Sequence, residues 1–245
     1  APLSERGEMS YRTGLRIVEM VKEDLTPSKI MTRDAFENSV VLNSAIGGST
    51  NAPIHINAIA RHVGVELEVE DWQKIGLEIP LLVNMQPAGK YLGEDFHRAG
   101  GVPAVMNTLI KARKIHDSAL TVNGKTVAEN YAYTVTKNTD VIRTYENPML
   151  ENAGFVVLKG NICDSAVMKT SVISDNFRSQ YLSSPDSVNV FKVRAIVFEG
   201  PEDYHERIND PQLNIDVDCI LVIRGCGPVG YPGSAEVVNM QPPDS

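Results

Sequence analysis

Residues 32–64 read TRDAFENSVVLNSAIGGSTNAPIHINAIARHVG, and this stretch sets the character of the first half of the chain. Thr32 is a helix-capping residue type, and the apolar residues that follow it predict a helix over about residues 33–45. The double glycine Gly47–Gly48 is typical of a helix end. A second helix is predicted over about residues 52–62. The stretch therefore predicts two helices joined by a tight loop.

The loop between these helices offers polar groups to an anion. Ser49, Thr50 and Asn51 follow the double glycine directly. The first backbone N–H groups of a helix have no partner within it, so a substrate carboxylate or phosphate fits such a place. The same residues are also ordinary punctuation between two helices. The residues alone leave both interpretations open.

Helical patterns continue on both sides of this stretch. An amphipathic first helix is predicted from apolar residues at three- and four-residue spacing, namely Leu15, Val18, Val21 and Leu25. Leu81–Val83 is predicted as a buried strand. Another helix is predicted from Gly100–Gly101 to about Lys114.

Beyond about residue 116 the apolar runs become shorter and richer in β-branched residues. Asn123–Gly124 predicts a hairpin between residues 120–122 and 126–127. Strands are predicted at 155–158, 193–198 and 219–223. We therefore expect an α/β protein, with a helical α/β region over residues 1–140. A β-rich, barrel-like region, present only in part, is expected over residues 141–245.

Composition excludes several classes of protein. The 245 residues include 23 Lys and Arg against 31 Asp and Glu, a net charge of −8, which disfavours a nucleic-acid partner. No apolar run approaches the roughly 20 residues of a membrane span. Three cysteines do not form a disulfide framework and suit a reducing compartment. A cytoplasmic protein is expected, with a mitochondrial location as the alternative.

Two further segments contain residues that could bind a ligand or metal. Gly225–Gly230 matches G-x-G-x-x-G, but no helix follows, so it is not a dinucleotide fingerprint. Glu236, just beyond this loop, is either a ligand for a hard cation such as magnesium or a solvated surface residue. Cys163, Cys219 and Cys226 lack a C-x-x-C or histidine-rich partner, which disfavours a metal site built from them.

In this order, the segments resemble the dihydroxy-acid and sugar-acid dehydratase family, also called the IlvD/Edd family. The resemblance extends over nearly the whole chain and is clearest at residues 14–25, 43–52, 82–90, 99–103, 158–161, 198–203 and 224–236. The form Gly-Pro-Val-Gly-Tyr-Pro-Gly at 227–233 is similar to the branch that acts on aldonic acids.

The resemblance implies a fold, a reaction and cofactors. The fold is an α/β domain followed by a β-barrel-like domain. The reaction converts a 2,3-dihydroxy acid, here a small sugar acid, into a 2-keto-3-deoxy acid, with an iron–sulfur cluster (a 2Fe–2S cluster is expected) and Mg²⁺. A homo-oligomeric parent protein is implied. The alternatives are the dihydroxy-acid dehydratase of branched-chain amino-acid synthesis and a truncated homologue that binds sugar acids or is purely structural.

Some family positions carry over to this chain and others do not. Glu236, in its Pro-Gly-x-x-Glu context, matches a magnesium ligand. Residues 49–51 match a loop near the active cleft and are the expected substrate-binding residues. The cluster cysteines and the other magnesium ligands match nothing here, and the motif with the catalytic serine is expected beyond Ser245. The resemblance thus implies an internal piece that holds no catalytic residue and is inactive alone.

Overall fold

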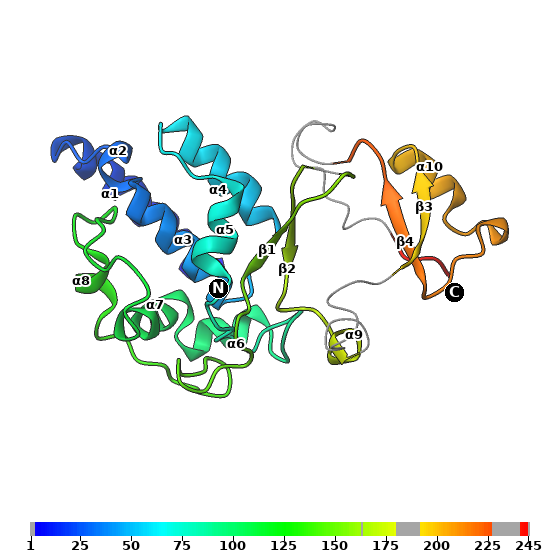
Figure 1. The fold of residues 1–245 in the computed structure, drawn as a ribbon. Coiled ribbons are helices and arrows are strands. Elements are labelled where there is room, and N and C mark those ends of the chain that lie inside the picture. Colours follow the sequence, from blue (N-terminus) through cyan, green and yellow to red (C-terminus); the bar gives the residue numbers. More distant parts are fainter. Residues whose placement is uncertain (1–2, 163, 180–191, 227–240, 245) are drawn as a thin grey trace. The chain divides into compact units, whose positions relative to one another are not determined.

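A computed structural model of the chain describes residues 3–162, 164–179, 192–226 and 241–244 (Figure 1). The chain divides into two compact units, Ala1–Val172 and Ile173–Ser245, and each is described by itself. Helices combine with small sheets, which confirms the α/β class. The strands of the described ranges form two two-stranded sheets and no closed barrel. The division into domains 1–140 and 141–245 stays a prediction.

The first unit consists mainly of helices. Its helices and strands are α1 Leu3–Lys22, α2 Pro27–Ile30, α3 Arg33–Ala45, α4 Asn51–His62, α5 Val69–Gly76, α6 Gly93–Ala99, α7 Gly101–Lys111, α8 Val127–Tyr131, β1 Phe155–Leu158 and β2 Ala166–Lys169. The strands β1 and β2 pair antiparallel, with Phe155 opposite Lys169. Helix α5 packs on β1 and on α3, which places β1 against the helices.

The predicted pair of helices in residues 32–64 is confirmed. Helix α3 has the predicted bounds, and the Thr32 hydroxyl accepts a hydrogen bond from the backbone of Ala35 at 3.4 Å. Gly47 follows with a φ of +63°, a left-handed conformation that favours glycine. Helix α4 begins at Asn51, one residue before the expected start. Local capping chemistry was sufficient to predict this part of the fold.

The two larger clusters of buried side chains in the described residues hold the first unit together. One contains Val41, Leu82, Val105 and Ile142, all at most 3% exposed. The other surrounds Trp72, whose indole ring meets the Phe155 ring edge-on at 5.5 Å between centroids. The clusters join α3 to α7 on one side and to α5 and β1 on the other, so α3 is the central helix of the unit.

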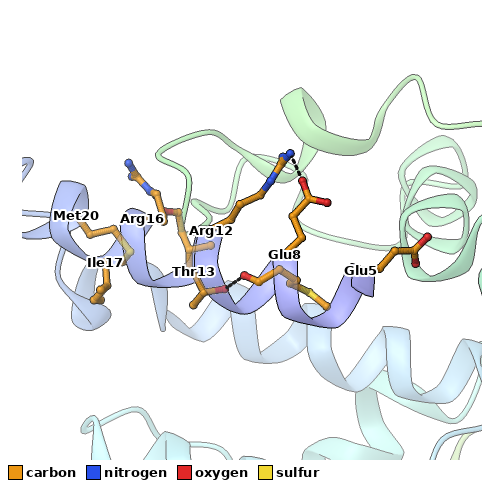
Figure 2. Close-up of a pocket in the computed structure, with 9 residues that line it drawn as sticks. Glu5, Glu8, Arg12, Thr13, Arg16, Ile17 and Met20 are labelled. Carbon is orange, nitrogen blue, oxygen red and sulfur yellow. Dashed lines mark hydrogen bonds and ion pairs between the residues drawn. The ribbon is translucent and has the colours of Figure 1, made fainter. Parts of the chain in front are cut away.

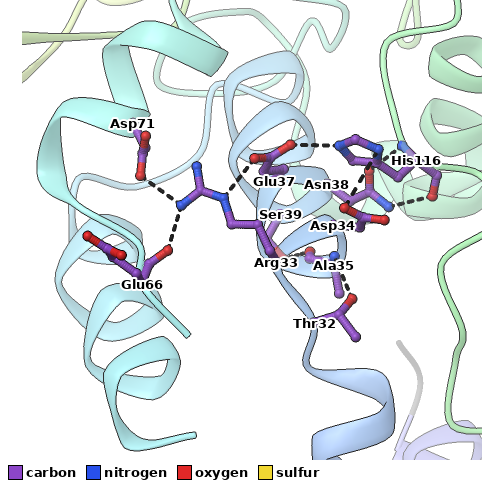
Figure 3. Close-up of polar contacts among 10 residues, drawn as sticks. All are labelled: Thr32, Arg33, Asp34, Ala35, Glu37, Asn38, Ser39, Glu66, Asp71 and His116. Atoms are coloured by element: carbon purple, nitrogen blue, oxygen red, sulfur yellow. Dashed lines mark hydrogen bonds and ion pairs between the residues drawn. The ribbon is translucent and has the colours of Figure 1, made fainter. Parts of the chain in front are cut away.

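A polar network links the start of α3 to α5 and to the segment that contains His116 (Figure 3). Arg33 donates to Glu37 at 2.7 Å and to the Asp71 carboxylate of α5 at 2.9 Å. His116 contacts Glu37 at 2.7 Å. The hydrogen bond from Arg33 lowers the pKa of Asp71. Burial alone would raise the pKa of Glu37, but hydrogen bonds with Arg33 and His116 outweigh it and lower that pKa.

Replacing Arg33 by methionine is expected to reduce the free energy of unfolding by about 1 to 2 kcal/mol at pH 7. Because the pKa of Asp71 is lowered in the fold, its contribution is present above the ordinary carboxyl pKa and is lost as pH falls. The difference between Arg33→Met and wild type should therefore narrow between about pH 5 and pH 3. Urea unfolding followed by the fluorescence of Trp72, the one tryptophan, measures it.

Arg98→Met is the matched control for this experiment. Arg98 pairs with Glu94 on the surface, where the two side chains are 70% and 67% exposed. An exposed pair contributes little, so this variant should stay within about 0.5 kcal/mol of wild type. An Arg33→Met deficit that is the same at pH 3 and pH 7 would contradict the assignment to the carboxylates.

Two predictions about the first unit need correction, and the first concerns Leu81–Val83. This segment is buried as expected, but it forms only isolated bridges and no regular strand. Leu81 pairs with Leu150, and Val83 pairs with Ile142. The partners come from irregular segments, so a continuous ladder does not form.

The second correction concerns the predicted hairpin around Asn123–Gly124. A single antiparallel bridge joins Leu120 to Thr126, and α8 begins at Val127 instead of a strand. The Thr126 hydroxyl accepts from the backbone of Glu129 at 3.1 Å, and the Glu129 carboxylate accepts from the backbone of Thr126 at 2.7 Å. This capping box was the missed signal, because Thr-x-x-Glu is a helix start.

The apolar stripe predicted for the first helix lies on α1, and it is open to solvent. Leu15, Val18 and Val21 are 54%, 53% and 76% exposed. The periodicity correctly predicted a helix with an apolar face. It does not reveal what packs on that face, and in the described ranges these three side chains remain largely open to solvent.

The second unit has a small parallel sheet of its own. Its elements are α9 Asp175–Phe177, β3 Arg194–Phe198, α10 Pro201–Arg207, a 3-10 turn Pro211–Leu213 and β4 Cys219–Ile223. Strands β3 and β4 pair in parallel, with Arg194 opposite Cys219. Tyr204 of α10 packs against Phe198 at 5.0 Å between ring centroids. The predicted strand at 219–223 is confirmed. The strand predicted at 193–198 is also present, but it begins one residue later, at Arg194.

Candidate anion-binding loop

Residues from three segments meet at the loop between α3 and α4. A Cβ added to Gly47 would lie 2.8 Å from Leu81 Cδ1, 3.6 Å from Ser171 Oγ and 3.9 Å from Ala88 Cβ. Leu81 and Ala88 belong to the chain that follows α5, and Ser171 comes just after β2. The loop is therefore packed tightly on its inner side, which restricts the positions of the residues that follow it.

The three predicted substrate-binding residues lie at the start of α4, where Ser49 and Thr50 precede the helix and Asn51 is its first residue. Ser49 and Thr50 are exposed and Asn51 is half-buried. The Ser49 hydroxyl accepts a hydrogen bond from the Asn51 backbone at 3.1 Å. Thr50 is the N-cap residue of α4, and its side chain makes no capping bond. The structure thus places all three residues side by side at the start of α4, and their role in substrate binding stays a prediction.

Lys169 of β2 reaches this loop from a distant part of the sequence. Its Nζ donates to the Gly47 carbonyl at 2.6 Å, across 122 residues of chain. Lys169 is not among the predicted site residues, because the sequence pattern does not predict the strand Ala166–Lys169. Burial lowers the pKa of the Lys169 ammonium.

The neighbouring loop, residues 84–91, is held by its own hydrogen bonds. The Asn84 side chain accepts from the Lys90 backbone at 2.8 Å and donates to the Asp140 carbonyl at 3.1 Å. The Tyr91 hydroxyl donates to the Asp140 carboxylate, and this bond raises the pKa of Tyr91. Because a Cβ added to Gly47 would lie 3.9 Å from Ala88 Cβ, the two loops lie close together.

The other predicted site residues are distributed differently. Glu236 and Cys163 lie outside the described residues. The Cys219 thiol donates to Asp216 at 3.0 Å within the second unit and is half-buried, as is Cys226. Outside the gaps at 163, 180–191 and 227–240, no three His, Cys, Asp or Glu side chains are grouped so that they could hold a metal ion.

A groove of about 710 Å³ lies along α1, away from the predicted site residues (Figure 2). Met9, Ile17 and Met20 supply its apolar surface, and Arg16 connects it to the 120s loop by donating to the Val122 carbonyl at 2.7 Å. Of the polar groups at its rim, Arg12 pairs with Glu8 within α1, whereas Glu5 lies 3.7 Å from His97 of α6. The groove contains none of the residues that match a family site.

No helix within the described residues is long and apolar enough to cross a membrane.

Comparison with known proteins covers both ends of the chain. Residues 1–130 match the family model of the dihydroxy-acid/6-phosphogluconate dehydratase N-terminal domain, and residues 140–245 match that of the C-terminal domain. The chain is 58% identical to D-xylonate dehydratase of Caulobacter vibrioides over all of its length and 41% of that protein. It is 48% identical to L-arabinonate dehydratase of Rhizobium leguminosarum bv. trifolii, with 97% of this chain and 39% of that protein covered.

A more distant relative carries a different name. The chain is 40% identical to the dihydroxy-acid dehydratase of Caldanaerobacter subterraneus subsp. tengcongensis, with 98% of this chain and 41% of that protein covered. The chain thus spans about two fifths of the length of these curated relatives. Because the two family models together cover nearly every residue, the chain belongs to the dihydroxy-acid/6-phosphogluconate dehydratase family.

Proposed function

We propose that the protein to which this chain belongs is a hydro-lyase that removes water from a sugar acid. The substrate is an aldonic acid with hydroxyl groups at C2 and C3. A proton leaves C2 and hydroxide leaves C3, and the resulting enol rearranges to a 2-keto-3-deoxy acid. The 58% identity to a D-xylonate dehydratase over the whole chain is the observation that carries the proposal.

The loop of residues 49–51 supports a role in holding the substrate. Ser49 and Thr50 are exposed, while tight packing around Gly47 holds the loop beneath them. Preorganised donors of this kind suit a carboxylate group. We assign Ser49, Thr50 and Asn51 to substrate binding on this basis.

We propose that the whole protein uses the family's iron–sulfur cluster and Mg²⁺, although the described residues contain no complete binding site for either. Iron–sulfur clusters are bound by cysteine thiolates, and Mg²⁺ by oxygen ligands. The described residues group no set of three metal-binding side chains, so they do not fit either group by themselves. No step is therefore assigned through a [2Fe–2S] cluster or through Mg²⁺. Glu236 is proposed as one magnesium ligand on the family match alone.

The direct test is an activity assay of the full-length polypeptide that contains this chain, purified without oxygen. D-xylonate, L-arabinonate and a branched-chain 2,3-dihydroxy acid are compared, and 2-keto acid is measured with semicarbazide. We expect the highest kcat/KM with a sugar acid. A preference for the branched-chain acid would favour the alternative, a dihydroxy-acid dehydratase. If none of the substrates yields a 2-keto acid, the result would favour a non-catalytic homologue.

Replacing Glu236 by glutamine in that polypeptide is expected to reduce activity at least about 100-fold, because a neutral amide is a much poorer magnesium ligand. Magnesium content after dialysis is the second measurement. Glu199→Gln is the control, because the Glu199 carboxylate is exposed and pairs with Arg224 at 2.9 Å. Equal loss in both variants would contradict a specific role for Glu236.

The isolated 245-residue chain is expected to be inactive and to bind no stoichiometric iron. Its three cysteines match no cluster ligand of the family, and neither Cys219 nor Cys226 lies in a described cluster of metal-binding side chains. Iron and acid-labile sulfide, measured after anaerobic purification, test this. Stoichiometric values would instead make Cys163, Cys219 and Cys226 the ligands to mutate.

Two further proposals concern the whole protein. Its partners are a small sugar acid and further copies of itself, with no nucleic acid or membrane. Relatives from bacteria support a cytoplasmic rather than a mitochondrial location.

A further inference from the structure

Several lysines of the described residues form ion pairs with carboxylates, but Lys169 does not. Lys159 pairs with Glu70 at 2.6 Å, and Lys29 pairs with Asp24 at 2.7 Å. Lys169 forms no ion pair with any carboxylate in the described part of the chain, although it is half-buried. Its described contact is the bond from Nζ to the Gly47 carbonyl. An ammonium group has three donors, so this bond leaves two for another ligand.

Two more polar groups beside the double glycine lack partners. Asn43 Nδ2 and Ser171 Oγ are buried and have no hydrogen-bond partner among the described residues. Ser171 is only 8% exposed, and its Oγ lies against Gly47. A Cβ added to Gly48 would lie 1.9 Å from Asn43 Oδ1, which shows how closely that amide abuts the loop. Buried donors without partners are rare, and each one calls for an explanation.

A ligand with negative charge would explain this arrangement. A side chain whose only role was to hold the Gly47 carbonyl would need just one neutral hydrogen-bond donor. A charged ammonium at this half-buried position costs additional desolvation free energy. A carboxylate supplies both the opposite charge and the acceptor oxygens, and hydrogen bonds between charged groups are the strong ones. Ser49 lies two residues beyond Gly47, so their Cα atoms are within about 7 Å of each other.

We infer that Lys169 binds the substrate's carboxylate at the Gly47–Asn51 loop, together with the exposed residues Ser49 and Thr50 that precede α4. This inference rests on the proposed function, because that function supplies an acidic substrate. Lys169 would then hold both the loop, through the Gly47 carbonyl, and the substrate. It is a substrate-binding residue outside the set predicted from sequence.

The first experiment measures the access of Lys169 in the full-length polypeptide. The rate of its acetylation by an amine-acylating reagent is followed by mass spectrometry, with and without D-xylonate. We expect D-xylonate to slow acetylation of Lys169 at least fivefold. Xylitol, which has the same carbon chain without a carboxylate, should have no effect. Lys159 serves as the internal reference. Equal rates with and without D-xylonate, or equal protection by xylitol, would overturn the inference.

The second experiment separates substrate binding from a purely structural role. Lys169→Met should raise KM for the sugar acid at least tenfold, and Lys169→Arg should restore part of the loss because it keeps the charge. Lys159→Met is the matched control and should leave KM unchanged. An unchanged KM in Lys169→Met, or no rescue by arginine, would overturn the inference while activity in the wild type would still support the proposed function. If the Lys169→Met variant does not fold, acetylation of the wild type still decides.

The two proposals can fail independently. If no sugar acid is dehydrated, the proposed function fails. Comparing the protection of Lys169 by D-xylonate with that by xylitol still tests for a carboxylate site. If sugar acids are dehydrated without protection of Lys169, the loop holds the substrate in another way or does not hold it, and the inference about Lys169 is wrong.

Discussion

Replacing Trp72 by alanine is expected to lower the free energy of unfolding of the first unit by about 3 to 5 kcal/mol. The Trp72 side chain is fully buried and packs with Phe36, Val40, Leu67 and Phe155. Truncation leaves a large cavity where α5, α3 and β1 meet. It also leaves the Asn57 amide oxygen without the indole N–H that it accepts at 2.8 Å. Both effects have the same sign, and a domain is stable by only about 5 to 15 kcal/mol in total.

The measurement is urea unfolding followed by circular dichroism at 222 nm, because the substitution removes the one tryptophan. Trp72→Phe separates the two effects, since it keeps most of the buried ring and removes the N–H donor. Tyr133→Ala is the control for losing an aromatic residue, because Tyr133 is 92% exposed, and it should stay within about 0.5 kcal/mol of wild type. A Trp72→Ala deficit as small as that of Tyr133→Ala would show that this cluster does not stabilise the unit.

Helix boundaries could be predicted wherever local chemistry determines them. Thr32 and the Gly47–Gly48 pair lie at the two ends of α3, and the structure places its bounds as expected. The prediction is wrong at Thr126, because Asn123–Gly124 indicates a hairpin while the capping box of Thr126 and Glu129 starts a helix. Both signals are local, so this error could have been avoided from the sequence.

Long-range contacts could not be predicted in the same way. Leu81–Val83 is apolar enough for a buried strand, but its partners are irregular segments about 60 residues and more away along the chain. The stripe with Val18 and Val21 shows which face of α1 is apolar and not what covers it.

In the candidate site, too, the local residues could be predicted from the sequence and the long-range contact could not. Ser49, Thr50 and Asn51 were identified because capping residues after a double glycine are visible in the sequence. Lys169 was not, because only the fold brings it to the Gly47 carbonyl.

Replacing Gly154 by alanine is expected to cost about 3 kcal/mol of unfolding free energy, the upper end of the usual cost of overpacking. An added Cβ would lie 2.1 Å from the Gly76 carbonyl oxygen, 2.4 Å from its carbon and 2.8 Å from Leu77 Cα. All three are backbone atoms, so no rotamer change can relieve the clash. The end of α5 and the start of β1 must move apart, which weakens the Thr170 backbone bond to the Gly154 carbonyl at 3.2 Å.

The same movement would loosen the contact between Trp72 and Phe155, the residue next to Gly154, so tryptophan fluorescence reports on it directly. Gly160→Ala is the matched control, because a Cβ at Gly160 meets nothing within 4 Å and the same chemical change should cost less than about 0.5 kcal/mol. We expect a lower urea midpoint and a red-shifted native emission for Gly154→Ala alone. Equal midpoints for the two variants would mean that α5 and β1 do not approach as closely as Gly154 indicates.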